Sequence, residues 1–216
     1  MRRRLKLLVV LVSLSAGALF ASPQDSQAVF IDFESLSDLE PITTQFASEG
    51  VVFEDAVALV SGAIGGTLNE VEFPPRSGVT VLSHDFVDGT PTPVTLRFDP
   101  VPFSSVSGFF TYATPIDTLF LSAFDPDGNL LITVSSAFND NTALFGDPGS
   151  SPNELIQISG VGSIGSLVID GRGGEWVLDD FAGTPIPEPA TAVLFGIALA
   201  GLSRYNSRRW PGSRTS

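Results

Sequence analysis

Between Val29 and Thr184 the chain consists of short apolar segments separated by turns that are rich in Gly, Pro and Asp. Apolar and polar residues alternate in Val94–Phe98, Val106–Phe110 and Leu130–Val134. A period of two residues places successive side chains on opposite faces of an extended strand. No segment of this region repeats its apolar residues with the 3.6-residue period of a helix. The pattern therefore predicts an all-β domain.

The same signals predict seven further strands and the turns between them. The strands are expected at Val29–Phe33, Val51–Phe53, Val79–Leu82, Leu119–Phe124, Leu155–Ile158, Leu167–Asp170 and Trp176–Phe181. Turns are expected at Asp88-Gly89, Asp127-Gly128, Asp147-Pro148-Gly149 and Gly171–Gly174. Many short strands joined in this way favour an antiparallel β-sandwich with a jelly-roll-like arrangement.

The chain ends in a stiff acidic segment, an apolar run and a basic cluster. Pro187 and Pro189, on either side of Glu188, restrict the backbone to extended conformations. Ala190–Leu202 has no charged residue and is predicted to form a C-terminal transmembrane helix, although a full span needs roughly 20 residues. The basic residues that follow are Arg204, Arg208, Arg209 and, further on, Arg214. They are expected to hold that end in the cytoplasm. An amphipathic helix packed on the domain is the alternative, but the run has no polar face.

This order of features resembles the PEP-CTERM sorting signal of exported bacterial proteins, over about Ile186–Arg209. The resemblance implies processing by exosortase, a membrane enzyme of the transpeptidase type, near Pro187-Glu188-Pro189. It also implies an inner-membrane-tethered intermediate whose product reaches the cell surface or the extracellular space. We therefore divide the chain into a signal peptide (1–28), a β-sandwich domain (29–184) and a sorting signal (185–216).

The N-terminus independently has the features of a secretory signal peptide. Its positive residues are Arg2, Arg3, Arg4 and Lys6, and an apolar stretch follows at Leu7–Phe20, which predicts an N-terminal signal helix. Ser26-Gln27-Ala28 has the small-x-small pattern of a cleavage site, so we expect signal peptidase to cut after Ala28. Ala21 is a competing site, and an uncleaved anchor is the alternative.

Between these two ends the body is strongly acidic. It holds 22 of the 24 Asp and Glu residues but only three of the 11 Lys and Arg residues, a formal net charge of −19. Such a surface repels nucleic acid and anionic lipid and attracts divalent cations, so we expect no nucleic-acid partner. The chain has no cysteine, which excludes disulfides and thiolate chemistry.

The first and last strands of the body both carry carboxylates, Asp32 and Glu34 on one and Asp179 and Asp180 on the other. The body is similar to secreted jelly-roll domains found among PEP-CTERM proteins, in its opening Ile31-Asp32-Phe33-Glu34 and its closing Val177–Phe181. In many carbohydrate-binding jelly rolls the first and last strands lie side by side and share a structural calcium ion. The resemblance therefore implies a Ca²⁺ site on these carboxylates, whose hard oxygens suit calcium. Solvated carboxylates on paired strands are the alternative.

Three motifs that superficially match functional sites are predicted to be structural. His84 stands between Ser83 and Asp85, but neighbouring residues on a strand point to opposite faces, so we expect an exposed histidine at a strand end. Gly160–Gly165 matches GxGxxG without a following helix, which indicates a glycine turn. Asp125–Asn129 is expected to be a hairpin turn, because no acidic residue stands where a calcium loop requires its bidentate ligand.

Together these features predict an exported, non-catalytic protein of the cell surface or extracellular matrix. The alternative is a carbohydrate-binding module for exopolysaccharide, which needs exposed aromatic side chains, and Trp176 and Trp210 are the only tryptophans. A secreted hydrolase is a third hypothesis, since a glycosidase needs two carboxylates about 5–10 Å apart. The sequence distinguishes no such pair among its many acids.

Overall fold

The computed structural model describes residues 27–87, 90–114 and 117–187. One compact unit spans Ser26–Ile186. The predicted N-terminal signal helix and C-terminal transmembrane helix lie outside the described residues. Within the described ranges, no helix has the length and apolar character needed to cross a membrane.

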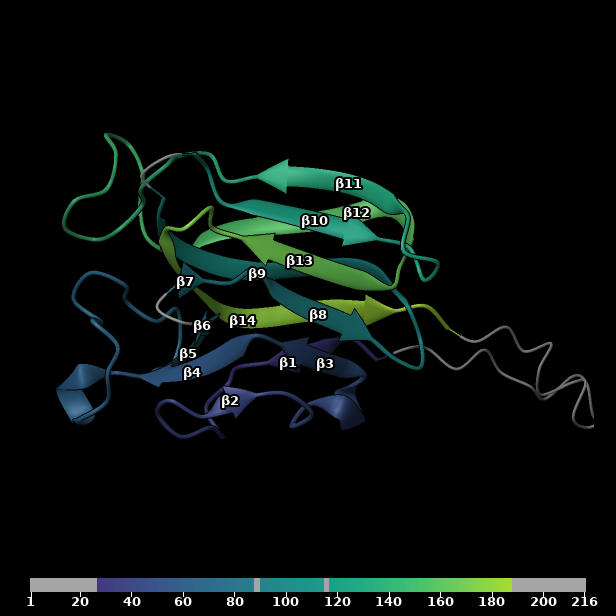
Figure 1. Cartoon of the computed structure of the whole chain (residues 1–216), viewed down its shortest axis with the longest axis horizontal. Coiled ribbons are helices and arrows are strands. Elements are labelled where there is room, and N and C mark those ends of the chain that lie inside the picture. The colour runs from purple at the N-terminus through teal and green to yellow at the C-terminus, as the bar shows by residue number, and fades with distance from the viewer. Residues whose placement is uncertain (1–26, 88–89, 115–116, 188–216) are drawn as a thin grey trace, which may run out of the picture. The chain divides into compact units, whose positions relative to one another are not determined.

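Two antiparallel sheets form a β-sandwich, and Figure 1 shows β10, β13 and β8 of one sheet lying over β12, β9 and β14 of the other. The seven-stranded sheet has the order β12-β9-β14-β5-β4-β2, with β1 also paired to β14. Its strands are β1 (Val29–Ile31), β2 (Pro41–Ile42), β4 (Ala56–Val60), β5 (Thr80–His84), β9 (Phe103–Ala113), β12 (Glu154–Ile164) and β14 (Glu175–Pro185).

The five-stranded sheet has the order β11-β10-β13-β8-β3. Its strands are β3 (Val51–Glu54), β8 (Val94–Phe98), β10 (Phe120–Phe124), β11 (Leu130–Ser135) and β13 (Ser166–Asp170). A separate hairpin joins β6 (Phe86–Val87) to β7 (Thr90–Pro91), and two short 3₁₀ helices lie at η1 (Ala47–Glu49) and η2 (Gly62–Ile64). The prediction of antiparallel sheets in a sandwich is confirmed.

Each of the ten predicted strands overlaps an observed strand. Alternation was a reliable signal because it matches burial: in β8, Val94, Leu96 and Phe98 are buried while Arg97 points outward and pairs with Glu54. Four strands were missed, namely β2, β4, β6 and β7.

Of two predicted turns, one is confirmed and one is wrong. Asp125–Asn129 is the hairpin between β10 and β11, as expected. Gly160–Gly165, expected to be a turn, lies largely inside β12, where the pairing with β9 is irregular.

The main core lies between the two sheets and is rich in aromatic side chains. Phe33, Phe53 and Phe46 contact one another edge to face, with ring centroids 5.8 to 6.1 Å apart. Phe98 stacks on Phe103 at 4.3 Å. Trp176 is 1% exposed and belongs to the same cluster. Burial of this much aromatic surface stabilises the sandwich without a disulfide.

The outer face of the seven-stranded sheet carries a second, smaller cluster. Ser61–Val79, between β4 and β5, folds over this face, and its Leu68 and Phe73 pack with Val81 and Val177 of the sheet. All five residues of β5 are buried, because Val81 packs in this cluster on one face and Leu82 packs in the main core on the other. The segment Ser61–Val79 is called the covering segment below.

Strand β14 runs the length of the sandwich and defines its two ends. Its first residue pairs with Ala113 of β9 and its last with Phe103, and 11 residues of strand span about 33 Å. We name the two ends of the sandwich after Glu175 and Pro185. Val29 pairs with Gly183, so the body begins and finishes at the Pro185 end.

Candidate functional site

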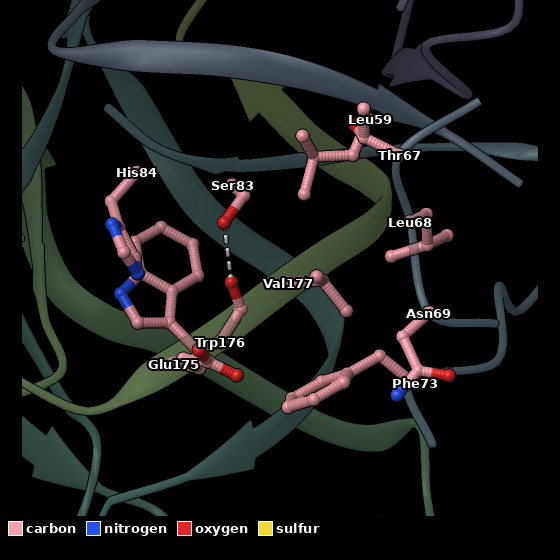
Figure 2. A pocket seen from close by; sticks show the side chains of 10 residues that line it. All are labelled: Leu59, Thr67, Leu68, Asn69, Phe73, Ser83, His84, Glu175, Trp176 and Val177. Atoms are coloured by element: carbon pink, nitrogen blue, oxygen red, sulfur yellow. Dashed lines mark hydrogen bonds between the residues drawn. The ribbon is translucent and has the colours of Figure 1, made fainter. Parts of the chain in front are cut away.

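A pocket of about 240 Å³ lies at the Glu175 end, between the covering segment and the outer face of the seven-stranded sheet (Figure 2). Its apolar lining is Leu59, Leu68, Phe73, Trp176 and Val177. Its polar lining is Thr67, Asn69, Ser83, His84 and Glu175. The second cluster thus leaves a hollow beside it with an apolar base and hydrogen-bonding side chains around it.

His84 occupies the inner part of this pocket. It is the last residue of β5, is 1% exposed and lies against Trp176, with ring centroids 5.8 Å apart (Figure 2). The expectation of an exposed histidine was wrong, because the strand end is buried. Burial lowers the pKa of His84, since the charged imidazolium loses hydration there. The side chain is therefore neutral near pH 7.

Ser83 lies next to His84 but is directed elsewhere. Its hydroxyl donates a hydrogen bond of 2.8 Å to the backbone carbonyl oxygen of Trp176, drawn as the dashed line in Figure 2. A nucleophilic serine instead shares its proton with a general base. The arrangement accordingly resembles a packed strand end more than a Ser-His pair.

A second pocket of about 380 Å³ adjoins the first, and Glu175 lines both. Its other lining residues are Ala113, Thr114, Asn139, Asp140, Gly173 and Gly174. Gly174 is required here, because a Cβ atom at this position would lie 2.4 Å from the carbonyl oxygen of Ala113. The close approach of these backbones shapes the floor of the second pocket.

The loops around the pockets are held by side chains that bind backbone groups. Asp147 accepts hydrogen bonds from the N–H groups of Asn139 and Asp140. Thr67 donates its hydroxyl proton to Asp38 at 2.9 Å. Such bonds fix the positions of the pocket walls before any ligand binds.

The pockets carry negative charge. Both are lined by Glu175, and the second also by Asp140. Among the described residues that line either pocket, none is Lys or Arg. An anionic ligand would therefore find no counter-charge in the lining.

Three of the four predicted calcium ligands surround residues 76–80, where the covering segment ends and β5 begins. Strands β1 and β14 are paired, with Ile31 opposite Phe181, as the prediction required. Glu34 accepts from the N–H groups of Val79 and Thr80 at 2.9 and 2.8 Å, and Asp179 accepts from those of Arg76 and Ser77 at 2.7 and 2.9 Å. Asp180 accepts from the hydroxyl of Ser77 at 2.8 Å. Asp32 instead accepts from the N–H of Glu34 at 3.2 Å.

Backbone N–H donors thus neutralise part of this carboxylate charge. Asp179 is 1% exposed, and burial raises its pKa to about 6 against the opposing effect of its hydrogen bonds. Across the part of the chain that the structure describes, no three His, Cys, Asp or Glu side chains are grouped as a metal site would require. The calcium site stays a prediction.

Calcium titration tests that prediction. If Asp179 and its neighbours bind Ca²⁺, millimolar calcium is expected to raise the melting midpoint, because a ligand that binds only the native state stabilises it. The shift should disappear in the Asp180→Asn variant and should exceed any shift caused by magnesium. A midpoint that calcium leaves unchanged would contradict the prediction.

The sequence did not reveal the pockets. Several lining residues, among them His84 and Trp176, had been assigned to predicted strands or strand ends, but none was predicted to line a pocket, and His84 was expected at the surface. Of the processing residues, Ala28 is exposed directly before β1 and Pro187 is exposed. Glu188, Pro189, Arg204, Arg208 and Arg209 lie outside the described residues.

Comparison with known proteins identifies the C-terminal segment. Residues 185–209 match the PEP-CTERM protein-sorting motif, which confirms the resemblance seen in the sequence. A comparison with curated proteins found no match.

Remote likenesses exist among solved structures. The K2 cleaved adhesin domain of Lys-gingipain has a TM-score of 0.41 at 13% identity, covering 73% of this chain and 97% of that one. The K1 domain from Porphyromonas gingivalis W83 has a TM-score of 0.41 at 11% identity, covering 73% and 98%. TmCBM61, solved with β-1,4-galactotriose, has a TM-score of 0.35 at 11% identity, covering 69% and 100%. At such scores they bear on neither ligand nor activity.

Proposed function

We propose that this PEP-CTERM domain-containing protein acts outside the cell as a non-catalytic protein of the surface or extracellular matrix. The sorting motif at residues 185–209 is the observation that carries the proposal. It marks the chain as exported, with a transient membrane anchor and exosortase as its processing enzyme. Signal peptidase would act first, after the exposed Ala28.

The junction between body and motif supports release of an intact domain. The motif starts at Pro185, the last residue of β14, and the N–H of Ile186 donates to the carbonyl oxygen of Pro102 at 2.9 Å. A cut near Pro187-Glu188-Pro189 would remove none of the sandwich. The mature protein would keep both sheets and its acidic surface.

The immediate surroundings of the only histidine support a non-catalytic role. The hydroxyl of Ser83 donates its hydrogen bond to the backbone carbonyl oxygen of Trp176 and not to the neighbouring His84. A secreted hydrolase remains the less favoured hypothesis, since this serine is not paired with a base as a nucleophile would be.

A carbohydrate-binding module for exopolysaccharide is the second candidate, in a sandwich that we propose to be of jelly-roll type. The chain passes repeatedly between the two sheets, from β8 to β9 to β10 and from β12 to β13 to β14, which supports that arrangement. Trp176 does not supply the exposed aromatic platform, because it is 1% exposed. The paired pockets at the Glu175 end favour this candidate instead.

Changing the sorting motif is expected to block maturation. In a Pro187→Ala, Glu188→Ala double variant, the full-length chain should accumulate in the membrane fraction, because exosortase no longer recognises the segment. Intact mass of the protein in each cell fraction measures this. The wild type should give a mature species that ends near residue 187.

Glu49→Gln is the matched control, since it removes one exposed carboxylate at the same end of the sandwich without touching the motif. It should mature like the wild type. Normal processing of the double variant, or a wild-type chain that keeps its tail in every fraction, would count against exosortase sorting.

A further inference from the structure

We propose that the two pockets that share Glu175 form one binding site for a neutral oligosaccharide. The proposal names a ligand class for the carbohydrate-binding candidate above. Its biological role rests on the proposed export to the cell surface, but the binding itself does not.

The lining suits a sugar. A sugar ring has apolar C–H faces and hydroxyl groups at its edge, so it needs both apolar contact and hydrogen-bonding partners. The first pocket supplies the apolar base through Phe73 and Val177 and hydrogen-bonding groups through Asn69 and Thr67, whose hydroxyl oxygen can still accept although its proton is donated to Asp38. The second adds the exposed amide of Asn139, while the buried hydroxyl of Thr114 donates to the backbone carbonyl oxygen of Asn139 and helps to shape the wall. Amide and hydroxyl side chains both donate and accept, as sugar hydroxyls do.

The size favours a short saccharide. The pockets measure about 240 and 380 Å³, whereas pockets for drug-sized ligands usually measure roughly 300–1,000 Å³, so each is at or below the small end of that range. Each pocket therefore has room for a small ring system but not for a folded partner. Because Glu175 lines both, one ligand of linked rings can contact both pockets.

The charge selects among saccharides. Glu175 and Asp140 can accept hydrogen bonds from hydroxyl groups, and charged acceptors make these bonds stronger. The same two carboxylates repel uronic acids and phosphorylated or sulfated sugars, and the body around them is strongly acidic. A neutral oligosaccharide avoids this penalty.

The position of the site fits a displayed protein. Glu175 begins β14 and Pro185 ends it, so about 33 Å of strand separates the site from the residue where the sorting motif starts. The site thus lies at the end of the sandwich that does not carry the attachment. Polysaccharide outside the cell can reach it there without competition from the attached segment.

Trp176 offers a direct measurement, because it lines the first pocket and the only other tryptophan is Trp210 in the sorting signal. The full chain with Trp210→Phe therefore reports on this pocket alone. Titration with cellotetraose, mannotetraose and β-1,4-galactotetraose is expected to change the tryptophan emission saturably for at least one of them. Tetragalacturonate should cause no change at the same concentrations.

Variants then locate the site. Glu175→Gln keeps the shape of an exposed side chain but removes its charge, and we expect it to weaken binding about tenfold, as does loss of one charged hydrogen bond. Asn69→Ala should weaken binding similarly. Glu49→Gln, at the Pro185 end, should bind like the wild type. Equal melting midpoints would show that all variants are folded.

Several results would overturn the proposal. They are no emission change with any of the three neutral tetrasaccharides at millimolar concentration, equal or stronger binding of tetragalacturonate, and unaltered affinity in both pocket variants. Binding in solution does not depend on processing by exosortase. Failure here and failure of the sorting experiment can therefore be told apart.

Discussion

Replacing Asn141 by alanine is expected to lower the free energy of unfolding by about 2–4 kcal/mol. The side chain is 1% exposed and joins the loop after β11 to β9. Its Oδ1 accepts from the N–H of Tyr112 at 2.7 Å, and its Nδ2 donates to the carbonyl oxygens of Phe110 and Ser151 at 2.9 and 3.1 Å. Alanine would leave a buried N–H and two carbonyl groups without these partners, and a cavity in place of the amide.

Denaturant unfolding of the purified protein measures this loss. Asn129→Ala is the matched control: Asn129 is exposed in the hairpin between β10 and β11, where its side chain binds Asp125. The control should cost less than about 1 kcal/mol, as surface substitutions usually do. If the two variants were equally stable, the loop would not depend on Asn141. The saccharide site would then lose its structural support, since Asn139 and Asp140 lie on the same loop.

Replacing Asp179 by alanine is expected to lower the free energy of unfolding by about 2–3 kcal/mol. Its carboxylate accepts from the N–H groups of Arg76, Ser77 and Asp180, and the first two belong to the covering segment. Removal of a buried carboxylate by itself raises the free energy of unfolding and so offsets part of this decrease. The N–H groups left without an acceptor have the larger effect, and the covering segment loses its attachment to the sheet at this point.

Asp32→Ala is the control for Asp179, because Asp32 is exposed and accepts only a local hydrogen bond from Glu34. Thermal melting should show a large downward shift for Asp179→Ala and almost none for Asp32→Ala. Exchange of amide hydrogens in residues 76–80 should be faster in the Asp179 variant alone. Unchanged exchange there would show that other contacts hold the segment.

The ionisation of Asp179 adds a pH dependence to this prediction. Its pKa is raised from the ordinary 3.8 to about 6, so the native state binds a proton more readily than the unfolded chain does. The resulting stabilisation is fully present below pH 3.8 and is lost as the pH rises through about 6. Stability of the wild type minus that of Asp179→Asn should therefore fall between pH 4 and pH 7. A flat difference would contradict the raised pKa.

Much of the fold followed from local patterns. A strand with one buried face, such as Val94–Phe98, is recognisable from the alternation of apolar and polar residues. A turn is recognisable from an Asp-Gly pair such as Asp127-Gly128. Strand β4 was missed for a physical reason: Ala56–Val60 is a continuous apolar run, because both of its faces are covered over part of its length. Such a run has no alternation to detect.

The candidate site was beyond prediction because it depends on contacts between distant residues. Thr67, His84, Asn139 and Glu175 come from four separate parts of the chain, and nothing in their local sequence marks them. His84 was expected at the surface because strand ends usually are exposed. Its burial depends on packing against Trp176, which comes from a distant part of the chain.

The sequence alone determined the route of this protein and the class of its fold. The sorting motif is contiguous in the chain, and strand alternation is a local property, so both can be recognised in the sequence alone. The tertiary structure decided where the carboxylates go and where pockets form. Asp179 becomes an acceptor for the covering segment, and Glu175 lines two hollows, because the sheets bring together residues far apart in the chain. Pairing of distant strands fixes such sites, and no local pattern encodes it.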